Sequence, residues 1–204
     1  MATASGRIWT IPNVISLARL ACVPVFLWLL VWRDPPAPIA AGALLAVLGA
    51  SDWVDGYIAR HFDQGSELGK ILDPTADRVL LVAGAIALLY EDLGAAVNVM
   101  MCIVLAREVL IAAAGLTLAL AGARRIDVVW AGKAGTLALM FAMPLFLLAD
   151  NSSGAMQILA AICAWGFAIG GIALGYYAAT RYVPAARAAL REGRSARTTA
   201  EVHS

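Results

Sequence analysis

The sequence predicts an all-α integral membrane protein, with six transmembrane helices in one bundle preceded by a short interfacial helix. Composition is the first reason: the 204 residues are 62% hydrophobic and 14% charged, whereas soluble domains are about 45–50% apolar and about 25% charged. The second reason is that the apolar residues fall into six runs long enough to cross a bilayer. The connections between these runs are short, so no second domain fits among them.

The elements follow in order along the chain. Residues 8–15 mix apolar and polar side chains, which indicates an interfacial helix before the chain turns into the membrane at Pro12. A spanning helix needs about 20 mostly apolar residues, and the predicted spans are 14–32, 38–60, 69–90, 94–121, 128–149 and 155–177. Arg19 lies near the start of the first span, where its side chain is expected to snorkel to the headgroups. We therefore predict a membrane domain of residues 1–182 and a basic tail of residues 183–204.

The distribution of Lys and Arg predicts the orientation. Cations gather before the first span, in the second and fourth connections and after the last span, and they include Arg7, Arg60, Lys70, Arg124, Arg125, Lys133 and the tail arginines. The opposite side has Arg33 and several acids. By the positive-inside rule, both termini should be cytoplasmic in a cytoplasmic-membrane protein. The net charge of +1 says nothing useful about partners, and the sequence has no broad basic surface that would suggest nucleic acid.

Four aspartates cluster around the second connection, on this predicted cytoplasmic side. Asp52 and Asp55 are three residues apart near the end of the second span, and Asp73 and Asp77 are four apart at the start of the third. Each pair shares a helix face, and the connection is long enough to let the two faces oppose each other. Pro74 indicates that the third helix begins or bends there. Crowded carboxylates stay ionised when a divalent cation lies among them, and all-oxygen sites suit Mg²⁺, Mn²⁺ or Ca²⁺.

Small residues and a cation accompany the first aspartate pair. Gly56 and Ala59 leave a groove on the second helix, and Arg60 is a phosphate donor at its end. Two metals with spare coordination positions could hold a diphosphate and act on both sides of a phosphoryl displacement. The alternatives are an ordinary solvated acidic loop, an ion or proton pathway, and a non-enzymatic membrane scaffold. Transporters usually hold such acids near the bilayer midplane in repeated halves, and no repeat is evident here.

The segment reads D-x2-D-G-x2-A-R-x8-G-x3-D-x3-D, and it resembles the signature of the CDP-alcohol phosphatidyltransferases at every fixed position. The resemblance implies a six-helix membrane enzyme, usually dimeric, that transfers a phosphatidyl group from CDP-diacylglycerol to an alcohol and releases CMP. By the same resemblance, two ions of Mg²⁺ or Mn²⁺ would lie on Asp52, Asp55, Asp73 and Asp77, and Asp77 would also act as general base. The residues implied to bind CDP-diacylglycerol are Gly56, Ala59, Arg60, Ser66 and Asn13.

The acceptor alcohol is predicted from cations elsewhere. Arg107 and Glu108 lie within the fourth span, where a charged pair either faces a polar cavity or forms a structural ion pair. Together with Lys133 and Arg124, which the positive-inside rule also explains, Arg107 favours an acceptor that carries a phosphate. The segments "AREVLI" and "WAGKAGT" resemble the phosphatidylglycerophosphate synthase branch, which implies glycerol 3-phosphate. A cardiolipin synthase acting on phosphatidylglycerol, also an anionic phosphate, is the alternative; Arg78 and "GKAGTLALMF" depart from the usual synthase pattern.

Overall fold

The computed structural model describes residues 11–61, 69–120 and 130–202, with side chains described within 13–51, 72–117 and 130–180. This part of the chain is helical, with no strand. The elements are α1 (Ile11–Leu27), the π-helical turn η1 (Trp28–Trp32), α2 (Pro38–His61), α3 (Gly69–Glu91), α4 (Ala95–Leu120), α5 (Trp130–Asp150) and α6 (Gly154–Val202). The all-α prediction is confirmed for these residues; of the predicted interfacial helix, residues 8–10 lie outside them and residues 11–15 form the first part of α1.

Four of these helical stretches are long and apolar enough to cross a membrane. They are Asn13–Trp32, Ala95–Thr117, Trp130–Asp150 and Gly154–Thr180. In α2 the described side chains end at Ser51, and the stretch that they cover, Pro38–Ser51, is apolar; α3 carries the charged residues Asp73, Asp77 and Arg78. The structure therefore shows a membrane-type helical protein, while a bundle of six spans stays a prediction. Pro74 lies inside α3, which begins five residues earlier at Gly69.

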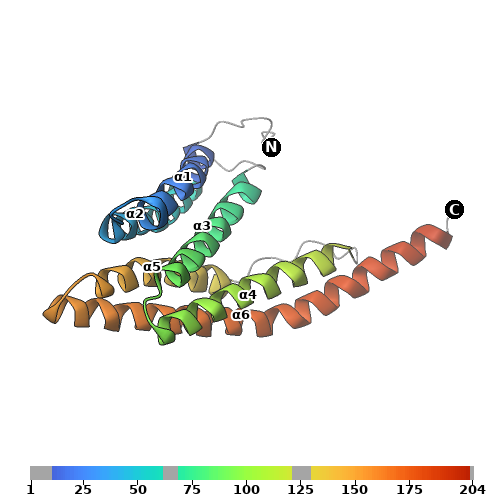
Figure 1. Ribbon diagram of the computed structural model, residues 1–204. Helices are drawn as coiled ribbons and strands as arrows, with labels where there is room; N and C mark the ends of the chain where they lie inside the picture. Colours follow the sequence, from blue (N-terminus) through green and yellow to red (C-terminus); the bar gives the residue numbers. More distant parts are fainter. Residues whose placement is uncertain (1–10, 62–68, 121–129, 203–204) are drawn as a thin grey trace.

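The helices form two groups that meet in the middle of the molecule. Figure 1 shows α1, α2 and α3 in the upper part of the view and α4, α5 and α6 below them, with α6 running on past α4 toward the C-terminus. The most extensive packing is between α5 and α6, followed by α1 with α3 and α2 with α5. Side chains such as Phe26, Leu45, Leu80 and Met143 fill the core between the groups. Because lipid tails are as apolar as these side chains, close packing holds such helices together better than hydrophobicity does.

Two glycines allow α5 and α6 to approach each other closely. A Cβ added at Gly135 of α5 would lie 2.7 Å from the Gly171 carbonyl oxygen, and a Cβ at Gly171 would lie 2.8 Å from the Gly135 carbonyl oxygen. Both distances are too short for a real side chain, so the two backbones touch where these glycines cross. Small residues serve this purpose widely in membrane helices. The crossing fixes how α5 and α6 are placed against each other.

The turns that precede α4 and α6 lie at the end of the molecule opposite the start of α3. Gly94 has φ 103° and Gly154 has φ 63°, values that favour glycine. At this end the side chain of Asn98 donates to Asp92 Oδ1 at 2.5 Å. Burial raises the pKa of Glu91, and the negative charge of Asp150 raises it further. Asp150 is therefore close enough to Glu91 to affect its pKa. The α3–α4 and α5–α6 connections thus lie at the same end of the molecule.

Candidate active site

A polar stripe on α1 forms the buried floor of the candidate site. Asn13, Ser16 and Arg19 recur every three residues, which places them along one side of the helix. Their exposed fractions are 2%, 1% and 1%, in a helix that is otherwise mostly apolar. Among the described residues, the remaining buried polar side chain is Glu108 on α4. Most of the buried polarity in this part of the chain is therefore gathered on one face of α1.

Arg19 joins this stripe to the two aspartates of α3. Its Nη1 atom donates a hydrogen bond to Oδ1 of Asp77 and lies 3.6 Å from Oδ1 of Asp73. The Ser16 hydroxyl donates to the same Asp73 oxygen at 2.9 Å. Asp73 and Asp77 are one helical turn apart, so both carboxylates can reach one guanidinium. The geometry makes Asp73 and Asp77 a single acidic group, held from α1.

The same arginine also reaches α2. Its Nη2 atom donates to the Ser51 hydroxyl at 3.3 Å, and Ser51 in turn donates to the Leu48 carbonyl oxygen at 2.7 Å. Because the Ser51 proton is used on its own helix, its oxygen is turned toward the guanidinium as an acceptor. Arg19 thus connects α1 with both helices that carry the acidic signature.

The expectation that Arg19 snorkels to the headgroups is wrong. Its side chain has no exposed surface in the structure, and it lies inside the bundle between α1, α2 and α3. The reason is that carboxylates are within reach there: an arginine paired with acids no longer gains by moving to the interface. The three-residue spacing of Asn13, Ser16 and Arg19 is the sequence signal that could have indicated an inward polar face.

The structure describes some of the other predicted site residues with their side chains, some by their backbone alone, and some not at all. Asp73 and Asp77 are brought together, and Asn13 is buried on the same α1 face two turns before Arg19. The residues on α2 have helical backbone but side chains outside the described part, namely Asp52, Asp55, Gly56, Ala59 and Arg60. Ser66 and Arg124 lie outside the described residues altogether. Within the described part no three His, Cys, Asp or Glu side chains are grouped for a metal, since half of the predicted set is not included.

The donor set that is described fits a hard cation. The carboxylate oxygens of Asp73 and Asp77 converge on one positively charged atom, Nη1 of Arg19. Carboxylate oxygens are the ligands that Mg²⁺ and Mn²⁺ prefer. Asp52 and Asp55 lie on α2 just after Ser51, the residue that Arg19 contacts. The backbone therefore places the Asp52–Asp55 pair on a helix that lies next to the helix with Asp73 and Asp77.

Arg107 and Glu108 form a second buried polar group, on α4. Nη1 of Arg107 donates to Oε1 of Glu108 at 2.6 Å, and their side chains are 10% and 8% exposed. The guanidinium lies against Gly175 of α6, where an added Cβ would be 2.5 Å from Arg107 Nε. Glycine at this position of α6 is what makes room for the arginine. The structure therefore shows an ion pair between neighbouring residues of α4, with the guanidinium packed against α6.

This second group lies at about the depth of the aspartates. Asp77 is 14 residues before the end of α3 at Glu91, and Arg107 is 12 residues after the start of α4 at Ala95. At 1.5 Å per residue these are about 21 and 18 Å along two packed helices that run in opposite directions. Lys133 is exposed near the start of α5, two residues before Gly135. A Cβ added at Gly135 would lie 3.2 Å from the nitrogen of Gly175, the residue of α6 that also contacts Arg107.

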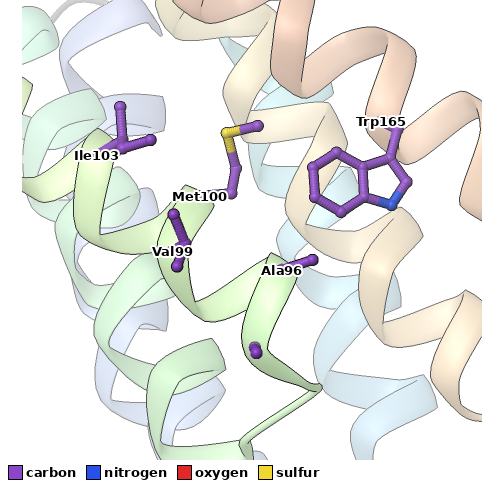
Figure 2. Close-up of a pocket in the computed structure, with 6 residues that line it drawn as sticks. Ala96, Val99, Met100, Ile103 and Trp165 are labelled. Carbon is purple, nitrogen blue, oxygen red and sulfur yellow. The ribbon is translucent and has the colours of Figure 1, made fainter.

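An apolar groove between α4 and α6 is a separate feature. It has a volume of about 450 Å³ and is lined by Ala95, Ala96, Val99, Met100, Ile103 and Trp165. Figure 2 shows the Trp165 ring across from Ala96 and Met100. The groove lies near the start of α4, at the end of the molecule away from Asp73 and Asp77, and no titratable side chain lines it. It therefore offers no group for the chemistry of the acidic site.

An apolar helical protein that holds paired carboxylates between its helices suits reactions of a membrane-bound phosphate ester. Comparison with known proteins makes the assignment specific. The family model of the CDP-alcohol phosphatidyltransferases matches residues 9–170, and the chain belongs to this family. It is a transferase of phospholipid biosynthesis.

Three relatives show which branches of the family are similar. A CMP-forming cardiolipin synthase of Streptomyces coelicolor is 39% identical over 190 residues, which cover 92% of this chain and 87% of the relative. The CDP-diacylglycerol–glycerol-3-phosphate 3-phosphatidyltransferase of Bacillus subtilis is 37% identical over 153 residues, 69% of this chain and 77% of the relative. The Escherichia coli protein of that name is 34% identical over 145 residues, 70% and 79% of the two chains. Both enzyme branches considered from the sequence are thus represented among the names of these relatives.

Proposed function

We propose that this protein transfers the phosphatidyl group of CDP-diacylglycerol to the hydroxyl of a phosphate-bearing glycerol acceptor and releases CMP. The observation that carries the proposal is the pairing of Asp73 and Asp77 on one face of α3, inside a family signature that is complete in the sequence. In this reaction the acceptor oxygen attacks the phosphorus that carries diacylglycerol. The bond from that phosphorus to the bridging oxygen breaks, and CMP leaves with the electron pair.

Asp77 is the base in this proposal. An alcohol is a poor nucleophile at neutral pH, so its proton must pass to a positioned group as the new bond forms. Asp77 lies one turn deeper in α3 than Asp73 and is fixed by Arg19. Its carboxylate takes the proton of the acceptor hydroxyl. The acceptor is therefore expected to approach from the side of α3 that faces α1 and α2.

The remaining signature residues hold the donor lipid. Asp52, Asp55, Asp73 and Asp77 would bind two Mg²⁺ or Mn²⁺ ions, which when bound neutralise the diphosphate and stabilise CMP as leaving group. The groups that bind the nucleotide and diphosphate are Gly56 and Ala59, which leave room beside α2, and Arg60, Ser66 and Asn13. Asn13 is supported by its burial on the α1 face that carries Ser16 and Arg19.

Phosphatidylglycerol is the acceptor that the comparisons favour. The similarity to a cardiolipin synthase extends over 92% of the chain at 39% identity, whereas that to the two glycerol-3-phosphate enzymes extends over 69% and 70% at lower identity. Glycerol 3-phosphate, the acceptor that the sequence segments implied first, becomes the second candidate in this proposal and is supported by those two relatives. Both acceptors present a phosphate, which suits Arg107 at the depth of Asp77, with Lys133 and Arg124 as further cations.

The placement in the membrane completes the proposal. All six helices cross the bilayer, with both termini and the aspartates on the cytoplasmic side, where CDP-diacylglycerol can keep its acyl chains in lipid. In this proposal the helix directions alternate, so that the start of α3, the end of α4 and the start of α5 lie on that side. The protein acts as a homodimer, as the family resemblance implies. Apolar side chains exposed along α4, including Val99, Val109 and Leu110, are compatible with contacts to lipid or to a second copy.

The test is CMP release from the purified protein with CDP-diacylglycerol and Mn²⁺. Phosphatidylglycerol and glycerol 3-phosphate are supplied in separate reactions, and the lipid product is identified by mass spectrometry. Metal-dependent release with phosphatidylglycerol and formation of cardiolipin is the expected result. Release with glycerol 3-phosphate alone would replace the acceptor and keep the reaction. No release with either acceptor, or with other alcohols, would contradict the proposed chemistry.

The role of Arg107 is tested in the same assay with a substitution on α6. In Gly175→Ala the new Cβ displaces the guanidinium, so the KM for the acceptor should rise about tenfold or more, as for other losses of a charged hydrogen-bond partner. The KM for CDP-diacylglycerol should not change. Gly170→Ala, also on α6 but with open space around the added Cβ, is the matched control. Equal effects on both substrates would indicate a structural ion pair instead.

A further inference from the structure

Arg19 lies outside the acidic signature, yet its side chain forms polar contacts with both helices that bear that signature. Its guanidinium is fully buried, with Nη1 on Asp77 and near Asp73 of α3 and Nη2 on Ser51 of α2. A charged group in this position is costly in a membrane protein unless partners surround it. Pairing a carboxylate would need only one of the two Nη groups. The second Nη group, directed to another helix, indicates a function beyond charge neutralisation.

The contact on α2 is placed immediately before the first acidic residue. Ser51 precedes Asp52 in the helix, and its hydroxyl is fixed by its bond to the Leu48 carbonyl. The contacts on α3 are themselves members of the second acidic pair. Arg19 therefore connects Ser51, which directly precedes the Asp52–Asp55 pair, with the carboxylates of Asp73 and Asp77. The separation of the two pairs decides whether their oxygens can share the same ions.

Arginine is suited to this task in a way that lysine is not. Its guanidinium is planar and carries donors at fixed angles, so two contacts on different helices define a distance and an orientation. Lysine would keep the charge but presents a single nitrogen. That nitrogen can contact the aspartates of α3 or Ser51 of α2 without fixing the distance between the two helices. Replacing arginine by lysine thus separates the effect of geometry from that of charge.

We propose that Arg19 is a positioning residue, which sets the spacing between the Asp52–Asp55 turn of α2 and the Asp73–Asp77 face of α3 through its simultaneous contacts with Ser51, Asp73 and Asp77. The proposal rests on the proposed function, because it takes the two acidic pairs as one metal-binding site. Ser16, which donates to Asp73 from the same α1 face, supports the carboxylate from a second point. Arg19 touches neither substrate nor metal in this role and acts through the acids.

The experiment compares Arg19→Lys with Arg33→Lys in the full-length protein. Arg33 is exposed in the α1–α2 connection and serves as the matched control. Mn²⁺ binding is measured by electron paramagnetic resonance without substrate, and kcat and KM are measured with CDP-diacylglycerol. For Arg19→Lys we expect kcat and Mn²⁺ affinity each to fall about 10- to 100-fold, the range found for groups that orient metal ligands. The KM for CDP-diacylglycerol and the melting temperature without metal should stay near those of the control.

Unchanged Mn²⁺ affinity and unchanged kcat per folded molecule in Arg19→Lys would overturn the proposal, whether or not the melting temperature falls. If Arg19→Lys does not fold, Ser51→Ala decides, since it removes the α2 contact and leaves the ion pair with α3. A fall in Mn²⁺ affinity in Ser51→Ala supports positioning, and wild-type affinity contradicts it. The metal-binding arm does not depend on turnover. If the wild-type protein releases no CMP, the proposed function is refuted. Mn²⁺ binding would still test the role of Arg19 in that case.

Discussion

At the scale of single residues, the candidate site shows how a buried charge is kept inside an apolar protein. Arg19 has its guanidinium between two aspartates and a serine from two other helices. Removing one partner of a buried ion pair typically costs about 3–5 kcal/mol, because the other charge is left uncompensated. The network is therefore both a structural element and part of the proposed site. Substitutions in it need measurements that separate folding from chemistry.

Asp77→Asn is the residue-scale test of the base. The amide keeps the size of the side chain and can still accept a hydrogen bond from Arg19, but it cannot take up the acceptor proton. CMP release should fall about 10²- to 10⁴-fold, the usual contribution of a general base. Binding of CDP-diacylglycerol, followed by equilibrium titration, should persist. Asp34→Asn, on an exposed aspartate of the α1–α2 connection, should behave as wild type. A wild-type rate in Asp77→Asn would remove Asp77 from this role.

Sequence reasoning located the acids more reliably than their partner. The spacing of Asp73 and Asp77 by one helical turn predicts a shared face, and the structure confirms it for this pair. The prediction for Arg19 was wrong because it considered only the distance to the headgroups. What holds Arg19 inward is the presence of carboxylates that are distant in the sequence, 58 residues away in the case of Asp77. The spacing of polar residues within α1 could indicate an inward face, but the carboxylates that this face meets depend on tertiary packing.

At the scale of helices, α5 and α6 depend on the crossing at Gly135 and Gly171. Gly171→Ala should lower the melting temperature in detergent, since the new Cβ would lie 2.8 Å from a carbonyl oxygen and 2.9 Å from Leu139 Cγ. Overpacking of this kind costs about 1–3 kcal/mol. Gly166→Ala on the same helix has open space and should be neutral or stabilising, because alanine favours helix more than glycine. Equal melting of the two variants would show that the crossing does not contribute.

The helix boundaries show what hydropathy can and cannot predict. The predicted spans agree with the observed helices closely where a polar turn ends the run, as at Glu91 and Asp150. At the C-terminus the prediction separated a span ending at 177 from a tail beginning at 183, but α6 continues as one helix to Val202. Helix formation follows backbone propensity, and the tail is rich in Ala and Arg, two strong helix formers. Hydropathy marks where the membrane ends and leaves the end of the helix undetermined.

At the scale of the whole molecule, the two groups of acids lie at opposite ends. Asp73 and Asp77 lie in the first half of α3, whereas Glu91 and Asp150 approach each other at the connections before α4 and α6. In the predicted orientation, the connections that hold Glu91 and Asp150 face away from the cytoplasm. The raised pKa of Glu91 belongs to that far end and has no direct part in the proposed reaction.

The orientation is testable by cysteine labelling. In a background without Cys22, Cys102 and Cys163, Ser153→Cys should react with a membrane-impermeant maleimide in intact cells, because it lies in the α5–α6 connection. Ser204→Cys should react only after permeabilisation. The reverse pattern would place the aspartates on the outer side, away from a cytoplasmic supply of CDP-diacylglycerol. Labelling of both in intact cells would show that the number of spans between them is even, so that α6 does not cross the membrane as a single span.

The Arg19 network also has a consequence for the order in which the chain enters the membrane. Its acidic partner Asp77 is made 58 residues after Arg19, which at 5–20 residues per second is a delay of about 3–12 s. During this interval the first span carries a charge whose partner Asp77 has not yet been made; such a charge costs about 2.5–3.5 kcal/mol at the centre of a membrane helix, and less near the end of the span, where Arg19 lies. We therefore expect Arg19 of the nascent chain to stay close to the membrane surface until α3 emerges. Burial of Arg19 would then be a late step in the assembly of the helices.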